Sequence, residues 1–211
     1  MVALVSAVFS ACHTSRPEPA IVRAQMPATR AETVLPLTPA KSDSAPAPTR
    51  YTDIQFMQGM IAHHAQALEM TTLIPSRTTR EDLRRLGERI DASQKAEIAM
   101  MQRWLRSHGA EVPSLDAHGM HHDAAGHMTM MPGMLTHVEM SQLEKSSGVE
   151  FERLFLQLMI RHHQGALTMV SDLMSTSGSA RDEQIFNYAT DINADQSAEI
   201  QRMQTLLRDI Q

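Results

Sequence analysis

The stretch MIAHHAQALEM, residues Met60–Met70, returns almost unchanged as MIRHHQGALTM, residues Met159–Met169. In both copies, apolar residues three and four positions apart flank two adjacent histidines, which is typical of an amphipathic helix. Agreement of this length at one constant offset indicates an internal duplication. The paired histidines are His63, His64, His162 and His163. They are candidate metal ligands, but a duplication also copies core residues, so the repeat alone leaves both interpretations open.

A second repeated frame follows each histidine stretch. QKAEIAMM at Gln94–Met101 matches QSAEIQRM at Gln196–Met203, with a slightly larger offset that indicates a short insertion at the turn. Each repeat therefore predicts a helical hairpin. Two such hairpins related by a pseudo-twofold axis predict an all-α protein, a four-helix bundle. Which hairpin helix faces which cannot be predicted from these patterns.

Start and stop signals set the expected limits of the helices. A capping box of Thr52 and Gln55 is expected to open the first helix, and Pro75 to end it. Gly109 is expected to end the second. The long helices are expected at about 52–73, 78–107, 147–175 and from 179 almost to the C-terminus. A short extra helix is expected from 136 to about 148, and a loop over 110–135.

The N-terminal part has a different composition. Residues 1–12 are a short apolar run ending in small residues and Cys12, which predicts an export signal with a lipobox-like cysteine. Ordinary signal cleavage is the alternative. Residues 13–50 are rich in Pro, Ala and Thr and predict a disordered tether. The folded domain is expected over 51–211, with repeat 1 at 51–108, a crossover at 109–148 and repeat 2 at 149–211.

Charge and composition narrow the class of ligand. The chain has 211 residues and a formal net charge of −5, which gives no reason to expect nucleic acid as a partner. It contains 17 Met and 11 His but one Cys, so no internal disulfide can form. The excess of methionine and histidine points instead to a metal ion as the partner.

Helical geometry predicts which residues face the interior. A helix turns about 100° per residue, which places both histidines of each pair on or beside the apolar face, with His64 and His163 nearer its middle. Glu97 and Glu199 fall within the apolar stripe of the second helices. A buried carboxylate needs a partner, which can be the histidines, an arginine at the rim or a metal. We expect these glutamates to approach the histidine pairs. Further candidates on the same faces are Met60, Met70, Met159 and Met169 as ligands and Asp53 and Glu152 as paired carboxylates.

The crossover holds methionines that core packing does not explain. Five histidines and six methionines lie between His118 and Met140, mostly in a segment expected to be a loop. Thioether sulfur suits Cu(I), and imidazole suits copper in both oxidation states. A flexible insertion without a ligand is the alternative. The candidate ligands here are His118, Met120, His121, His122, His127, Met128, Met130, Met131, Met134 and His137.

The chain from about residue 51 to 211 resembles domain-of-unknown-function family 305. The resemblance rests on DIQFMQGMIAHHAQALEM, QKAEIAMMQRWL, MPGMLTHVEMSQLEKSSGVEFERLFLQLMIRHHQGALTM and DINADQSAEIQRM. It implies a ferritin-like bundle, a bacterial cell-envelope location and a link to copper handling. It does not imply an established reaction.

Three functions follow as hypotheses. The first is an exported, lipid-anchored protein of the periplasm or membrane surface that buffers Cu(I), and also Cu(II), with silver as a possible ligand. The second is a metal-dependent oxidase using iron or manganese. It is less well supported, because Glu97 and Glu199 are followed three residues on by Met100 and Arg202 and not by the histidine of the Glu-x-x-His motif. The third is a structural or interaction module, in which the methionines are adaptable packing.

Overall fold

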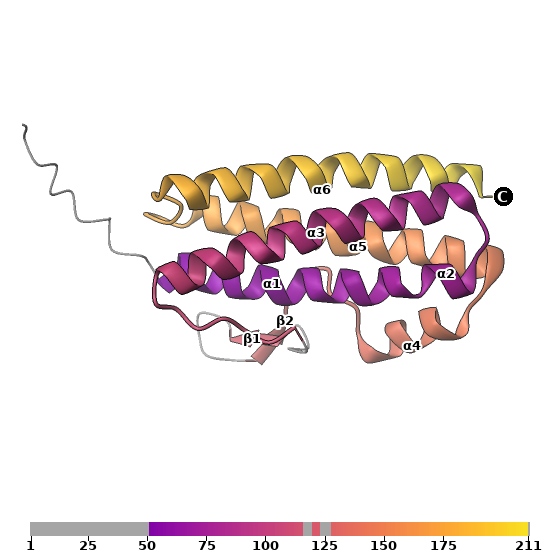
Figure 1. The fold of residues 1–211 in the computed structure, drawn as a ribbon, viewed down its shortest axis with the longest axis horizontal. Helices are drawn as coiled ribbons and strands as arrows, with labels where there is room; N and C mark the ends of the chain where they lie inside the picture. The colour runs from indigo at the N-terminus through magenta and orange to yellow at the C-terminus, as the bar shows by residue number, and fades with distance from the viewer. Residues whose placement is uncertain (1–50, 116–119, 123–127, 211) are drawn as a thin grey trace, which may run out of the picture. The chain divides into compact units, whose positions relative to one another are not determined.

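The computed structural model describes residues 51–115, 120–122 and 128–210. Its four long helices are α1 (Tyr51–Thr72), α3 (Glu81–Ser107), α5 (Gly148–Ser175) and α6 (Glu183–Asp209). They form two antiparallel hairpins, because α1 packs most extensively on α3 and α5 on α6 (Figure 1). The hairpins meet mainly through α1 and α5, whereas α3 and α6 contact each other less. The expected all-α, ferritin-like four-helix bundle of two duplicated hairpins is therefore confirmed.

The expected start of α1 was wrong in its detail. Thr52 lies inside the helix, and its hydroxyl lies 2.8 Å from the Ser179 hydroxyl at the α5–α6 turn, so it does not cap with Gln55. The expected end of this helix near residue 73 is confirmed, because α1 ends at Thr72. Pro75 lies in the single turn α2 (Ile74–Arg77), where its missing N–H is tolerated because first-turn N–H groups have no helical partner.

Two carboxylates at the N-terminal ends of the histidine helices hold the two hairpins together. Glu152 on α5 accepts hydrogen bonds from Thr78 Oγ1 at 2.5 Å and Arg80 Nε at 2.7 Å, at the turn of the first hairpin. Asp53 on α1 accepts one from the Ala180 N–H at 2.9 Å, at the turn of the second. A carboxylate of each hairpin therefore binds the turn of the other hairpin, as the pseudo-twofold relation requires.

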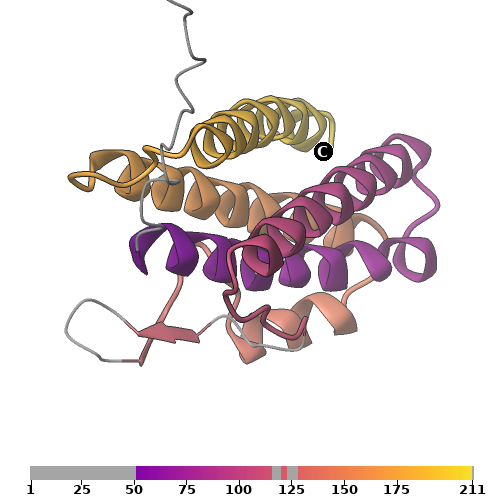
Figure 2. The same cartoon turned by 60° about the vertical axis from the view of Figure 1, so that its left-hand side comes forward.

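The crossover between the hairpins contains more structure than expected. Residues predicted as a loop include strands β1 (Met120–His122) and β2 (Met128–Met130), which pair antiparallel. Strands of three residues are too short to give an alternating pattern that sequence analysis can detect. The expected short helix is confirmed as α4 (His137–Lys145), opened by a capping box of Thr136 and Glu139. These crossover elements lie on the side of α1 and α5 away from α3 and α6 (Figure 2).

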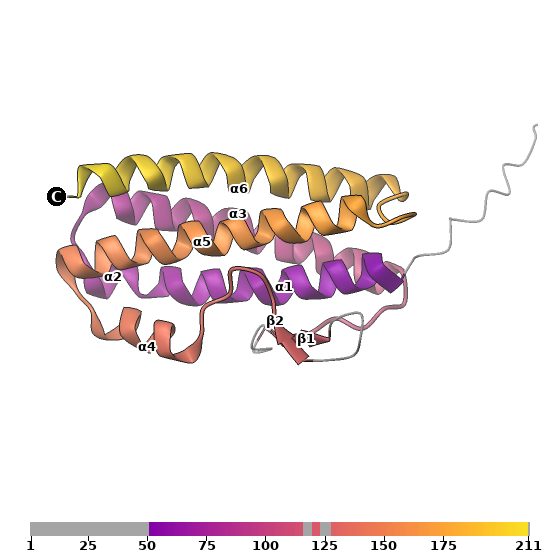
Figure 3. The same ribbon diagram turned by 180° about the vertical axis from the view of Figure 1, so that it is seen from behind.

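The segment between β2 and α4 extends toward α1 and α5 and lies against them (Figure 3). Gln66 on α1 fixes it through two hydrogen bonds, because its Nε2 donates to the Leu135 carbonyl at 3.0 Å and its Oε1 accepts from the Leu135 N–H at 2.7 Å. Gly133 and Gly165 allow the backbones to touch, since a Cβ at Gly165 would lie 2.0 Å from the Pro132 oxygen. Residues 131–135 are therefore docked on the bundle and are not a free loop.

The interior is divided into two apolar cores. One contains Phe151, Phe155 and Met159 of α5, and the other contains Phe56 and Met60 of α1. On every long helix, the residues of one core precede the residues of the other, and buried polar residues separate them. The polar residues therefore form a layer across the middle of the bundle. Among the described helices, none is long and apolar enough to cross a membrane.

Candidate metal centre

The polar layer is built by two residues from each long helix. All eight are buried, and the histidines are 0% exposed. The members are His63 and His64 on α1, Gln94 and Glu97 on α3, His162 and His163 on α5, and Gln196 and Glu199 on α6. Sequence analysis identified the histidines and the glutamates. It did not single out the glutamines, although they match each other in the repeat and lie one turn before Glu97 and Glu199.

Two of the histidines donate to carboxylates. His64 Nε2 pairs with Glu97 Oε2, and His163 Nε2 with Glu199 Oε2 at 2.7 Å. The predicted approach of both glutamates to the histidine pairs is therefore confirmed. Each pair forms within one hairpin, which the sequence could not decide. Because a carboxylate accepts hydrogen bonds, Nε2 of both rings carries the proton.

The third histidine donates to the crossover. His63 Nε2 lies 2.9 Å from the Pro132 carbonyl, which can only accept, so this ring also carries its proton on Nε2. Burial, and then the charge of a protonated His64, lower the pKa of His63 to about 3, although the bond to Pro132 opposes the shift. The His63 ring is therefore neutral at pH 7. No signal in the sequence could have identified Pro132 as its partner.

His162 is the fourth member and has no strong partner. Burial, and then the charges of the neighbouring histidines, lower the pKa of His162 well below its usual value. The backbone carbonyl of His63 is near enough to oppose this shift slightly, but neither nitrogen of His162 makes a hydrogen bond of good geometry with a described residue. The His162 ring is thus a buried, neutral imidazole.

Unused nitrogen atoms are the unusual property of this layer. Nδ1 of His63, His64, His162 and His163 is buried without a hydrogen-bond partner in the described structure. His63 is neutral with its proton on Nε2, so its Nδ1 presents a bare lone pair. In His64 and His163, Nε2 donates to a carboxylate and Nδ1 is left without a hydrogen-bond partner. A buried polar atom without a partner costs about 1–3 kcal/mol. An outer hydrogen bond from one ring nitrogen and a free lone pair on the other is the arrangement of metal-ligating histidine.

The spacing within each pair suits an ion held by two imidazoles. The ring centroids of His63 and His64 are 6.5 Å apart, and those of His162 and His163 are 6.2 Å apart. An ion held by metal–nitrogen bonds of about 2.0 Å to each ring separates the ring centroids by roughly 6 Å. By contrast, His63 and His162 are in ring contact at 3.9 Å. The geometry therefore favours one ion within a pair over one between the pairs.

The expected difference in depth between the paired histidines was wrong. His64 was predicted to lie nearer the middle of the inward face, yet His63 and His64 are both 0% exposed. The crossover segment covers the side of α1 on which His63 lies, and it therefore buries a position that an isolated bundle would leave near its rim. The two rings differ in partner, not in depth.

Negative charge lies close to the layer on its α3–α6 side. Partial burial, and then the charges of Glu97 and Glu199, raise the pKa of Asp195 on α6. Larger ligand groups do not form, because within residues 51–115, 120–122 and 128–210 no three His, Cys, Asp or Glu side chains are placed to hold one ion.

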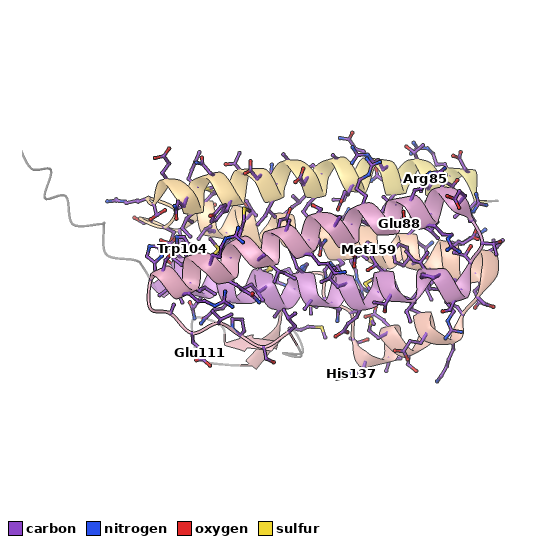
Figure 4. All side chains as sticks on the ribbon, in the orientation of Figure 1. Arg85, Glu88, Trp104, Glu111, His137 and Met159 are labelled. Carbon is purple, nitrogen blue, oxygen red and sulfur yellow. The ribbon has the colours of Figure 1, made fainter. Side chains whose placement is uncertain are left out.

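The other candidate ligands are dispersed. Met60, Met70 and Met159 are buried in the apolar cores, and Figure 4 shows Met159 between the helices. Met131, Met134 and Met169 gather in a separate cluster with Ala62. Met130 is 46% exposed, and His137 is exposed at the start of α4 (Figure 4). His118 and His127 lie outside the described residues, as do the side chains of Met120, His121, His122 and Met128.

Asp53 and Glu152, expected to be paired carboxylates near the histidines, are paired elsewhere. Glu152 is ten residues before His162 on α5, which places it about 15 Å away along the helix axis. Their hydrogen bonds go to the hairpin turns and connect the two hairpins.

The fold and this site define a class: four-helix bundles with a layer of buried, carboxylate-supported imidazoles. The chain belongs to the family described as domain of unknown function (DUF305), which matches residues 53–207. No curated protein matches the chain.

Several solved structures are similar. A DUF305 fragment from Deinococcus radiodurans has 29% identity and a TM-score of 0.65, covering 77% of this chain and 99% of that one. A DUF305 protein from Streptomyces coelicolor, named as a candidate secreted protein, has 30% identity and a TM-score of 0.63, covering 75% and 91%. CopM in its Cu(II)-bound form has 27% identity and a TM-score of 0.59, covering 76% and 99%. CopM in its Cu(I)-bound form has 27% identity and a TM-score of 0.56, covering 76% and 98%.

Proposed function

We propose that this protein binds Cu(I) at its buried histidine pairs and thereby sequesters or buffers copper in the bacterial cell envelope. One observation carries the proposal. Adjacent histidines in each repeat have Nδ1 atoms without partners, at a ring spacing suited to a two-coordinate ion. Cu(I) has a filled d shell and is stable with two ligands, whereas most other biological metals require more.

Charge supports a monovalent ion over a divalent one. The four histidine rings are fully buried, those of His63 and His162 are neutral, and burying an ion there costs less for a single charge than for two. Glu97 and Glu199 supply opposite charge through His64 and His163, so the ion is compensated without a carboxylate in its coordination sphere. The similarity to CopM, solved with Cu(I) and with Cu(II), agrees with this choice of metal.

The location is proposed from the N-terminal sequence. Residues 1–12 match an export signal, and Cys12 is the residue that a lipid would modify. A lipid on Cys12 and the tether 13–50 would hold the bundle at a membrane surface facing periplasmic copper. Mass spectrometry of Cys12 in protein from the native membrane is the test, and an unmodified or absent Cys12 contradicts the anchor.

The direct test of copper binding is an anaerobic Cu(I) titration of the full chain against a chromophoric chelator. The double variant H63Q/H162Q keeps a side-chain amide donor near the position of Nε2 but removes the Nδ1 ligand from each pair. We expect it to lose tight binding, while H108Q, outside the layer, binds as the parent does. Equal affinity for parent and H63Q/H162Q overturns the proposal.

The two other hypotheses, an oxidase and a structural module, make different experimental predictions. An oxidase would need a larger ligand group, and the described residues offer no observation that favours one. A purely structural role for the layer predicts that H63Q/H162Q changes the free energy of unfolding and leaves copper affinity unchanged. The same titration therefore distinguishes a structural layer from a copper site.

A further inference from the structure

We propose that Met131, Met134 and Met169 form a second site, a thioether site for a soft monovalent cation, that loads the buried histidines. The site lies where the crossover segment docks on α1 and α5. Binding at the thioethers stands independently of the proposed function, whereas the loading role rests on it.

The three methionines form a cluster of their own. Apart from Ala62, they are its only apolar members in the described residues; Met131 and Met134 lie outside the two cores of the bundle, whereas Met169 also packs against the core that contains Phe56 and Met60. Met131 and Met134 are 2% and 6% exposed, whereas Met169 is partly exposed. A Cβ at Gly59 would lie 3.3 Å from Met131 Sδ and 3.4 Å from Met169 Cε, so these two side chains meet above Gly59. The three side chains are thus clustered, and the partly exposed Met169 connects the cluster to the surface.

Docking of the crossover does not depend on methionine sulfur. Residues 131–135 are already held by the two hydrogen bonds of Gln66, by the bond from His63 to Pro132 and by the glycine contact at Gly165. Any aliphatic side chain of similar volume would fill the remaining space. Methionine in all three positions adds uncharged thioether ligands, which suit Cu(I) and Ag(I).

The site is adjacent to the buried imidazoles. Pro132 directly follows Met131, and its carbonyl is the acceptor of His63 Nε2. An ion held at Met131 is therefore separated from His63 by a single residue of the crossover turn. Because the histidines are 0% exposed, an ion must lose its water before reaching them. Neutral thioethers at the entrance can replace that water without adding charge.

Ag(I) is the probe, because it is soft, monovalent and not oxidised by air. Full-length protein with ¹³C-labelled methionine methyl groups reports binding at each methionine by NMR. We expect the methyl resonances of Met131, Met134 and Met169 to shift on Ag(I) addition, in the parent and in H63Q/H162Q alike. Unshifted resonances of these three methionines overturn the thioether site.

The loading role is tested by the rate of Cu(I) transfer from a chelator in a stopped-flow experiment. M131L/M134L/M169L preserves apolar volume, and we expect it to slow transfer several-fold while final occupancy of the histidines is kept. M101L/M203L, at buried core positions, is the matched control and should load at the parent rate. Transfer at the parent rate in the triple variant overturns the loading role, and the single variant M169L repeats the test if the triple variant does not fold.

The two proposals fail in different ways. If H63Q/H162Q binds Cu(I) as tightly as the parent, the proposed imidazole site is wrong. The thioether site is still tested in that case by the methyl shifts of the three methionines on Ag(I) addition. If the shifts disappear in H63Q/H162Q, the thioethers are not an independent site and this inference is wrong.

Discussion

The rings of His63 and His162 lie 3.9 Å apart, centroid to centroid, at the interface between α1 and α5. This contact brings the two histidine pairs together at the pseudo-twofold axis. Ions bound in the two pairs would repel each other through a low-dielectric interior. We therefore expect the second Cu(I) to bind about tenfold or more weakly than the first. Stepwise titration should show two affinities in the parent and one step in H162Q/H163Q, and two equal affinities in the parent would contradict the arrangement.

Removing the carboxylate partners should weaken copper binding without removing a ligand. In E97Q/E199Q the hydrogen bonds to His64 and His163 become neutral, and loss of such outer partners costs about 10–100-fold in metal affinity. Competition against a Cu(I) chelator measures the change. E88Q, at an exposed glutamate of α3, is the control and should bind as the parent does. An unchanged affinity in E97Q/E199Q would show that the glutamates only balance buried histidines.

Acid should destabilise the fold through the neutral histidines. The pKa of His63 is about 3 in the fold against 6.5 for an ordinary histidine, so the unfolded chain binds a proton that the folded chain rejects between these values. The free energy of unfolding therefore falls as pH drops from about 6.5, by about 1.4 kcal/mol per pH unit for each such histidine. Denaturant unfolding from pH 7 to pH 4 measures this slope. In H63Q this slope should be smaller by the contribution of one histidine, about 1.4 kcal/mol per pH unit. The same slope in H63Q and in the parent would refute the buried neutral state of His63.

Two glycines should respond differently to alanine. A Cβ at Gly165 would lie 2.0 Å from the Pro132 oxygen and 2.4 Å from the Pro132 carbonyl carbon, both rigid backbone atoms. G165A should therefore destabilise the protein by about 1–3 kcal/mol or displace the crossover. At Gly59 the nearest atoms are flexible methionine ends, and alanine gains up to about 1 kcal/mol of helix propensity. G59A should be close to neutral in denaturant unfolding, and similar losses in both variants would contradict the docked position of residues 131–135.

Glu152 should affect stability and not copper. In E152Q the charge-assisted hydrogen bonds from Thr78 and Arg80 are weakened, which should cost about 1.5–3 kcal/mol because Glu152 is only 5% exposed. E150Q, at an exposed position two residues earlier, should be neutral. Unfolding curves and Cu(I) titrations on the same samples separate the two effects. A loss of copper affinity in E152Q would restore Glu152 as a support of the metal site.

Much of the fold could be predicted because the helices are encoded locally. Apolar periodicity, the capping box at Thr136 and the stop at Gly109 depend on residues within a few positions of one another. Errors occurred where distant segments intervened. Thr52 bonds to Ser179, so a contact across the bundle replaced the local capping box expected with Gln55. Thr78 bonds to Glu152, and the helix expected from residue 78 begins at Glu81.

The sequence by itself determined the duplication, the two hairpins and the identity of the buried histidines and glutamates, because a repeat and a 3.6-residue period are visible along the chain. Only the tertiary structure decided that His64 and His163 each pair with the glutamate of their own hairpin and that the Pro132 carbonyl accepts a hydrogen bond from His63. It also decided which nitrogens are left free, since in His63, His64 and His163 packing gives Nε2 a partner and leaves Nδ1 without one. Partners distant in sequence meet through packing alone, and no local pattern encodes that choice.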